Sequence, residues 1–112
     1  MPATEFTRLT LLEPYGGVLV EGTFSGLDVT NPVLEVTLHF QIIQGGEAVA
    51  VGETTVKAPG TDFDWEGEAA PGTRRATDGD ALALGFAVIV KPPSFETHTW
   101  SQIKPIEPQA SG

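Results

Sequence analysis

Hydrophobic and polar residues alternate along most of this chain, with the two-residue period of β-strands that bury one side. The clearest example is the segment 33–43, VLEVTLHFQII. Its side chains fall into an apolar row, Leu34, Val36, Leu38, Phe40 and Ile42, and a polar row, Glu35, Thr37, His39 and Gln41. No window keeps apolar residues at helical spacing for more than one turn. The pattern predicts an all-β protein in which the apolar row is core and the polar row is exposed or shared with a partner.

Seven segments carry this pattern, separated by runs rich in Gly and Pro. They comprise residues 6–12, 18–25, 33–43, 48–57, 62–68, 80–90 and 95–104. Both rows of the segment 80–90 are apolar, which predicts a central strand covered on both sides. Trp65 and Trp100 are expected in the core, because an exposed indole would leave a large apolar area in water.

The pair Gly45-Gly46 predicts a two-residue hairpin between the third and fourth segments, because both positions of such a turn need a positive φ angle. The turn fixes a register in which His39 lies opposite Gly52 and Gln41 lies opposite Ala50.

Strands at this spacing predict a seven-stranded, immunoglobulin-like (Greek-key) β-sandwich. The chain has 112 residues, the size of one domain, so we expect a single domain over 1–112 with short polar tails at 1–4 and 107–112. It contains no cysteine, which excludes disulfides, thiolate catalysis and cysteine-bound zinc.

The stretch TDGDALAL, Thr77 to Leu84, resembles the approach to the sixth strand of immunoglobulin-like domains. Asp78 matches the acid of that motif, while Leu82 and Leu84 stand where the family has Tyr and Cys. The stretches VLVEGTFSG, LEVTLHFQIIQGGEAVAVGETTV and DFDWEG are similar in order to the immunoglobulin-like domain of bacterial spore germination and related envelope proteins. The resemblance implies a sandwich and carries no catalytic residues. Typical members have a signal peptide or lipid anchor, and this chain shows neither.

Acidic residues outnumber basic ones by fifteen to six, giving a formal net charge of −9. A phosphate backbone or an anionic membrane would be repelled, so neither is an expected partner. No segment has the length of apolar residues that membrane insertion needs. The absence of a signal peptide favours a cytoplasmic or virion-associated location.

Four acids alternate along the segment 62–68, which places them on one face of a strand about 7 Å apart. Repulsion between them is relieved by a cation, a basic partner or solvent and salt. Calcium is the one cofactor that the sequence suggests, and its candidate ligands are Asp62, Asp64, Glu66, Asp78 and Asp80. The alternative is a solvated acidic face that discourages aggregation.

Four residues are candidates for partner binding: Arg74 and Arg75 in the polar connection 69–77, and His39 and Gln41 in the polar row of the third strand. Pairing with an acidic neighbour, or simple exposure, are the alternatives for the arginines. The chain has no nucleophile elbow and no glycine-rich phosphate loop, so we do not expect an enzyme.

The sequence therefore predicts a non-enzymatic structural or interaction module that acts through protein–protein contacts or self-assembly, for example as a virion decoration or tail component. The alternative is a bacterial immunoglobulin-like adaptor that binds a protein partner or calcium through its loops and acidic strand.

Overall fold

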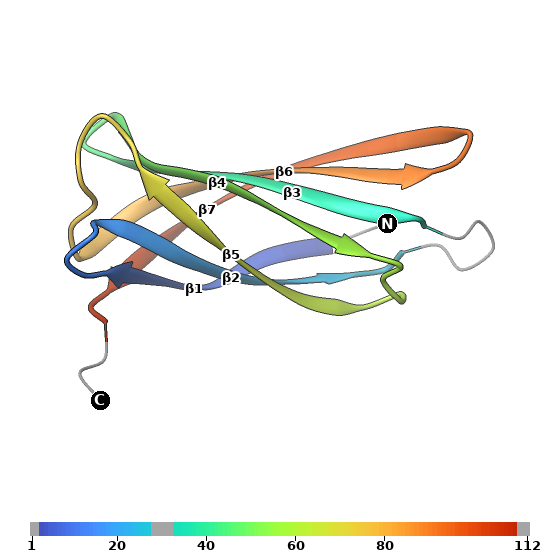
Figure 1. The fold of residues 1–112 in the computed structure, drawn as a ribbon, viewed down its shortest axis with the longest axis horizontal. Coiled ribbons are helices and arrows are strands. Elements are labelled where there is room, and N and C mark those ends of the chain that lie inside the picture. The colour runs from blue at the N-terminus through green and yellow to red at the C-terminus, as the bar shows by residue number, and fades with distance from the viewer. Residues whose placement is uncertain (1–2, 28–32, 110–112) are drawn as a thin grey trace.

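The computed structural model describes residues 3–27 and 33–109, and all the regular structure in those ranges is β-strand. The strands are β1 Ala3–Leu12, β2 Gly17–Ser25, β3 Glu35–Gln44, β4 Glu47–Lys57, β5 Phe63–Pro71, β6 Gly79–Lys91 and β7 Ser94–Glu107 (Figure 1). The all-β prediction and the seven predicted segments are confirmed. Within the described ranges, no helix is long and apolar enough to cross a membrane.

The predicted tails are only partly outside the strands. Ala3 and Thr4 belong to β1, and Glu107 is the last residue of β7. Residues 1–2 and 110–112 of the predicted tails lie outside the described residues.

The strands close into one barrel in the order β1-β2-β5-β4-β3-β6-β7, so the prediction of an immunoglobulin-like sandwich is wrong. A sandwich needs a break in the ladder between two sheets. Here β4 pairs with both β3 and β5, and β7 pairs with both β6 and β1, so no such break occurs. Alternation along each strand fixes which side chains face the interior, but it does not reveal whether the outermost strands of the two sides pair.

Closure relies on two short stretches of pairing. Strands β4 and β5 share three antiparallel pairs, between 50–52 and 69–71. Strands β1 and β7 share two parallel pairs, Leu9 with Ile106 and Thr10 with Glu107. Next to the β1–β7 pairs, the side-chain amide of Gln102 on β7 replaces a backbone partner for Phe6 on β1. Its Oε1 accepts from the Phe6 backbone N–H, and its Nε2 donates to the Phe6 carbonyl.

The hairpin at Gly45-Gly46 is confirmed, since both residues have positive φ angles, 60° and 78°. The predicted register is correct next to the turn and wrong beyond it. A β-bulge between Ile42 and Ile43 on the ladder shifts β4 by one residue, so His39 lies opposite Glu53 and Gln41 opposite Val51. The bulge lets two successive residues of β4, Val49 and Ala50, both reach the core.

Aromatic side chains fill the middle of the barrel. Trp65 contacts Phe6 edge-on at 5.7 Å between ring centroids and Phe40 in a stacked arrangement at 5.9 Å. Trp100 lies 5.2 Å from Phe6, and it packs against the core while remaining partly exposed. Both tryptophans therefore pack in the core as predicted, but this core is the interior of a barrel and not the space between two sheets.

Two of these rings lie directly on glycines of the neighbouring strand. Trp65 faces Gly22 across the β2–β5 ladder, and Trp100 faces Gly85 across the β6–β7 ladder. A Cβ atom added at either glycine would come within 2.3 Å of indole carbons. The aromatic rings thus occupy the space that side chains would need at those positions.

The strand β6 is central in the ladder, between β3 and β7, but its prediction as a strand covered on both sides is wrong. Its small residues face the interior, with Ala81, Ala83, Gly85 and Ala87 buried. The large residues of the other row face outward, and Leu82, Leu84 and Phe86 are each more than a third exposed. The interior has room only for small side chains from Ala81 to Ala87, where aromatic rings such as Trp100 already fill it, whereas the larger Ile89 is buried farther along the same row.

Candidate interaction surface

The outward side chains of β6 and its two neighbours form one broad surface with an apolar row along β6, which we call the β6 face. It comprises Thr37, His39 and Gln41 of β3, Leu82, Leu84, Phe86, Val88 and Val90 of β6, and Phe95, Thr97, Thr99, Ser101 and Ile103 of β7. Phe95 and Ile103 are the most exposed of its apolar members, at 67% and 75%. Val51 of β4 lies beside Gln41 and extends the surface. A continuous apolar patch of this kind is typical of a protein contact surface.

The β6 face carries shallow depressions rather than a deep cleft. One of about 330 Å³ lies over Gly52 and Gly85, with His39, Leu84 and Phe86 on its rim. Another, of about 380 Å³, is lined by apolar side chains at the β6–β7 turn: Val88, Val90, Pro92, Pro93 and Phe95, together with Ser94. Because Gly52 and Gly85 face the interior, the first depression lies between the outward side chains of their neighbours, such as Leu84 and Phe86, and protruding side chains of a partner can fit into it.

Carboxylates lie at the border of the β6 face and not within it. Glu35 flanks Val90, and Asp80 precedes Leu82 on β6. Glu53 lies across the ladder from His39, with 3.8 Å between its Oε2 and the imidazole Nδ1. The centre of the face, along β6 and β7, is therefore apolar or hydroxylated and uncharged.

The opposite side of the barrel, formed by β1, β2 and β5, has the reverse character. We call its outward carboxylates, Glu5, Glu21, Asp64, Glu66 and Glu68, the acidic face. Glu21 and Glu66 lie directly opposite each other on the ladder, and Arg8 is the other cross-strand neighbour of Glu21. A depression of about 430 Å³ lies between β1 and β5, with Thr7, Thr23 and Asp64 among its lining residues.

The structure does not bring the calcium candidates together. Asp62, Asp64 and Glu66 lie at and after the start of β5, whereas Asp78 and Asp80 lie at the start of β6. Because β5 and β6 run in opposite directions, these two groups are at opposite ends of the barrel. Asp62 instead accepts a hydrogen bond from the Gly26 backbone N–H at 3.2 Å. The described residues contain no group of three or more metal-ligating side chains, so calcium binding stays a prediction without geometric support.

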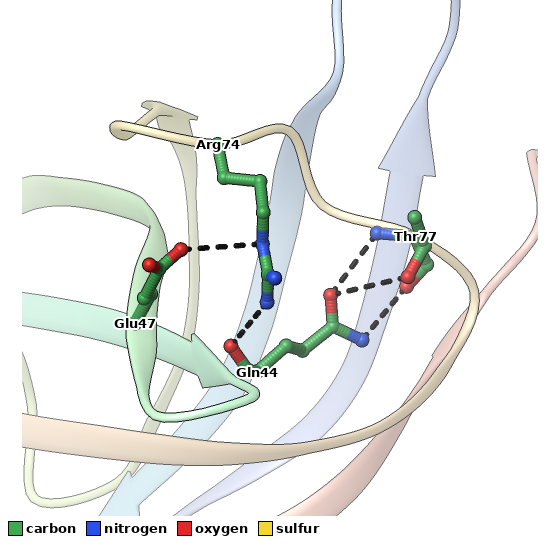
Figure 2. A network of polar contacts seen from close by, with 4 residues as sticks. All are labelled: Gln44, Glu47, Arg74 and Thr77. Atoms are coloured by element: carbon green, nitrogen blue, oxygen red, sulfur yellow. Dashed lines mark hydrogen bonds and ion pairs between the residues drawn. The ribbon is translucent and has the colours of Figure 1, made fainter.

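The predicted partner residues Arg74 and Arg75 contact turns of the same chain. The Arg74 guanidinium donates to the Gln44 carbonyl at 2.6 Å and pairs with Glu47 at 3.4 Å (Figure 2). The Arg75 side chain covers Gly16 in the β1–β2 turn, where an added Cβ would come within 2.4 Å of its Nε atom. Both arginines thus attach the connection between β5 and β6 to neighbouring hairpins.

Gln44 completes this attachment. Its side-chain amide accepts from the Thr77 backbone N–H at 3.0 Å and donates to the Thr77 carbonyl at 2.9 Å, as the stick view in Figure 2 shows. The amide also donates to the Asp80 carbonyl at 3.3 Å. These contacts hold the connection at one end of the barrel, at the left of Figure 1, away from the middle of the β6 face.

The other predicted partner residues, His39 and Gln41, are exposed and lie on the β6 face, next to Phe86 and Leu84. Their side chains border the apolar stripe, and the His39 ring lies 5.9 Å from the Phe86 ring. The second histidine, His98, has the opposite orientation on β7 and stacks on Trp100 at 6.0 Å. The polar row of β3 was therefore correctly placed at the surface, while the apolar residues beside it were missed as surface residues.

The alternation of large and small residues in ALALGFAVIV was the available signal for the apolar stripe. A row of small residues indicates a crowded interior, and the large row then has to face outward. Neither a family model, nor a curated protein, nor a solved structure matches the chain. The resemblance to the germination-associated family thus stays a prediction, and the sandwich it implied is not the fold observed.

Proposed function

We propose that this protein is a non-enzymatic structural or interaction module, and that the β6 face is the surface through which it contacts another protein. The observation that carries the proposal is the exposure of Leu82, Leu84 and Phe86 in one row, flanked by Phe95 and Ile103. At about 25 cal/mol per Å², covering such a row with a partner is strongly favourable.

The position of β6 in the ladder supports a contact through side chains. β6 pairs with β3 on one side and with β7 on the other, so its backbone is not open to a further strand. Side-chain packing is therefore the route to association on the β6 face. The short, uncharged Thr and Ser side chains of β7 cost little to desolvate compared with charges.

The distribution of charge points to the same face. The net charge of −9 repels most acidic proteins. Carboxylates lie on the acidic face and at the borders of the β6 face, but not at its centre around Phe86 and Thr99. A virion or other assembly component, as the sequence analysis suggested, needs one apolar surface for its neighbours and a charged surface for solvent. The alternative is an adaptor that binds a protein partner or calcium through its loops and acidic strand, and the described residues contain no metal-ligand cluster that would favour its calcium form.

The test uses two variants of the full chain in an extract of the cells that make it. Phe86→Glu places a charge at the centre of the β6 face, and Tyr15→Glu makes the same kind of change at an aromatic residue that is 52% exposed in the β1–β2 turn. We expect the wild type and the Tyr15 variant to retain a bound protein, further copies of this chain included, after cross-linking and affinity capture. We expect the Phe86 variant to lose it. Equal retention by both variants would contradict the proposed contact surface.

A further inference from the structure

We infer that the occupant of the β6 face is a second copy of this chain, which packs face to face about a twofold axis running between Phe86 and its counterpart. The inference rests on the proposed function and specifies its partner. It draws on the symmetry of the surface, its area and the placement of the charges.

The β6 face is symmetric about its midpoint. Phe86 of β6 lies opposite Thr99 of β7 on the ladder. Four residues on either side of Phe86 lie Leu82 and Val90, and four residues on either side of Thr99 lie Phe95 and Ile103. Each apolar residue of β6 and β7 at one end of the face thus has an apolar equivalent at the other end, whereas on β3 Ile43 at one end corresponds to Glu35 at the other.

A twofold axis that lies in the interface, perpendicular to the strands, makes use of this symmetry. It places β6 antiparallel on the β6 of the second copy and β7 on its β7. Phe95 of each copy then lies over Ile103 of the other, and Leu82 lies over Val90. The two most exposed apolar residues of the face would cover each other, as expected for an isologous contact in which the same patch serves both partners.

The area fits a weak dimer. From Leu82 to Val90, β6 spans about 26 Å, and the three strands β3, β6 and β7 span about 14 Å side by side. The face therefore offers roughly 370 Å² on each copy, and about 750 Å² in total, which is the size of a weak, transient interface. We expect a dissociation constant of roughly 20–200 µM.

The charges favour this orientation over others. Two copies of a chain with a net charge of −9 repel each other wherever their acidic faces meet. Face-to-face packing through the β6 faces leaves Glu21, Glu66 and their neighbours on the two outer sides of the dimer, where water and salt screen them. Of the carboxylates that border the β6 face, Glu53 lies level with Phe86, beside His39, so β4 stays outside the proposed contact.

Sedimentation velocity over about 1–500 µM protein tests the inference, a range chosen to bracket a micromolar dissociation constant. We expect the mass to rise from 11.8 kDa to twice that value. Phe86→Glu and Thr99→Glu each place two carboxylates face to face at the axis, and each should weaken the dimer at least 100-fold, on the order of a hot-spot loss. Thr99 is exposed, so its variant tests the contact without disturbing the core. Tyr15→Glu should leave the dimer intact.

The orientation is tested by cross-linking, because the wild type has no cysteine. Packed sheets lie about 10 Å apart, too far for a disulfide and within reach of a short bismaleimide reagent. Thr99→Cys on the axis should form a covalent dimer with this reagent. Thr23→Cys on the side of the acidic face should not.

A wild type that stays at 11.8 kDa over the whole range would overturn the inference of a second copy. The proposed contact surface would nevertheless survive that result if capture from extract still depended on Phe86. A dimer that both axis variants leave intact, or that cross-links through Thr23 and not Thr99, would also overturn the inference, because association would then use another surface.

Discussion

The substitution Gly22→Ala tests how the barrel is packed, because it adds one methyl group where the structure has no space. The added Cβ would lie 2.3 Å and 2.6 Å from indole carbons of Trp65 and 2.5 Å from the backbone oxygen of Glu5. Neither neighbour moves easily, since the carbonyl belongs to β1 and the indole is 4% exposed and packed against Phe6 and Phe40. Overpacking of this kind costs about 1–3 kcal/mol, and contact with two immobile groups places Gly22→Ala near the upper value.

For a chain of this length, a loss of about 2–3 kcal/mol lowers the melting temperature by roughly 8–12 °C. Urea denaturation followed by tryptophan fluorescence and circular dichroism measures the loss directly. The matched control is Gly60→Ala, because nothing lies within 4 Å of a Cβ added at Gly60. We expect that control to change the free energy of unfolding by less than about 0.5 kcal/mol.

A double-mutant cycle with Trp65→Phe identifies the cause. The smaller ring removes part of the overlap, so Gly22→Ala should cost at least about 1 kcal/mol less in the Phe background than in the wild type. Trp100 remains as the fluorescent probe. The packing would be refuted if Gly22→Ala were as mild as Gly60→Ala, or if its cost were the same in both backgrounds.

Three further predictions concern barrel closure, the acidic face and calcium. Gln102→Ala removes both hydrogen bonds to the Phe6 backbone, so the free energy of unfolding should fall by about 1–3 kcal/mol and the Phe6 amide should exchange faster. The control Gln41→Ala should change neither quantity. An unchanged exchange rate in the Gln102 variant would contradict the bridge. Glu66→Gln relieves repulsion from Glu21 across the ladder, so it should stabilise the protein by about 0.2–1 kcal/mol in low salt and by less in high salt, and a lower melting temperature would disprove that repulsion. Calcium at about 1 mM, a concentration that occupies even weak protein sites, should leave the melting temperature unchanged, and a clear increase would reveal a site that the described residues do not show.

The sequence was sufficient to predict the strands because alternation reports local burial. Val36, Leu38, Phe40 and Ile42 are buried as the pattern predicted, but Leu34 of the same row lies before the start of β3 and is 57% exposed. The Gly45-Gly46 turn forms as its φ requirements predicted. Both features depend on residues a few positions apart in the chain.

Closure of the barrel depends on contacts that no local pattern encodes. The pairs of β1 with β7, and the Gln102 bridge to Phe6, join residues almost a hundred positions apart. The bulge next to Val49 could not be predicted either, because the alternation of apolar and polar residues gives no sign of the position at which one extra residue enters the strand. That extra residue was enough to move Gln41 from the predicted partner Ala50 to Val51.

The β6 face was misread for a related reason. Both rows of β6 are apolar, and apolar residues usually indicate burial, so the row with Leu84 and Phe86 was expected to be covered by the chain itself. The interior is instead filled by aromatic rings such as Trp100, which faces Gly85. Hydrophobicity alone cannot distinguish a row buried within one chain from a row buried between two chains.

Carbene footprinting of side chains tests the central claim most directly, by comparing dilute purified protein with the protein in an extract of the cells that make it. We predict that labelling of Leu84, Phe86 and Ile103 falls several-fold in the extract, while labelling near Glu21 and Glu66 on the acidic face stays the same. Labelling of the β6 face that is equally strong in both samples, or protection confined to the acidic face, would contradict the account.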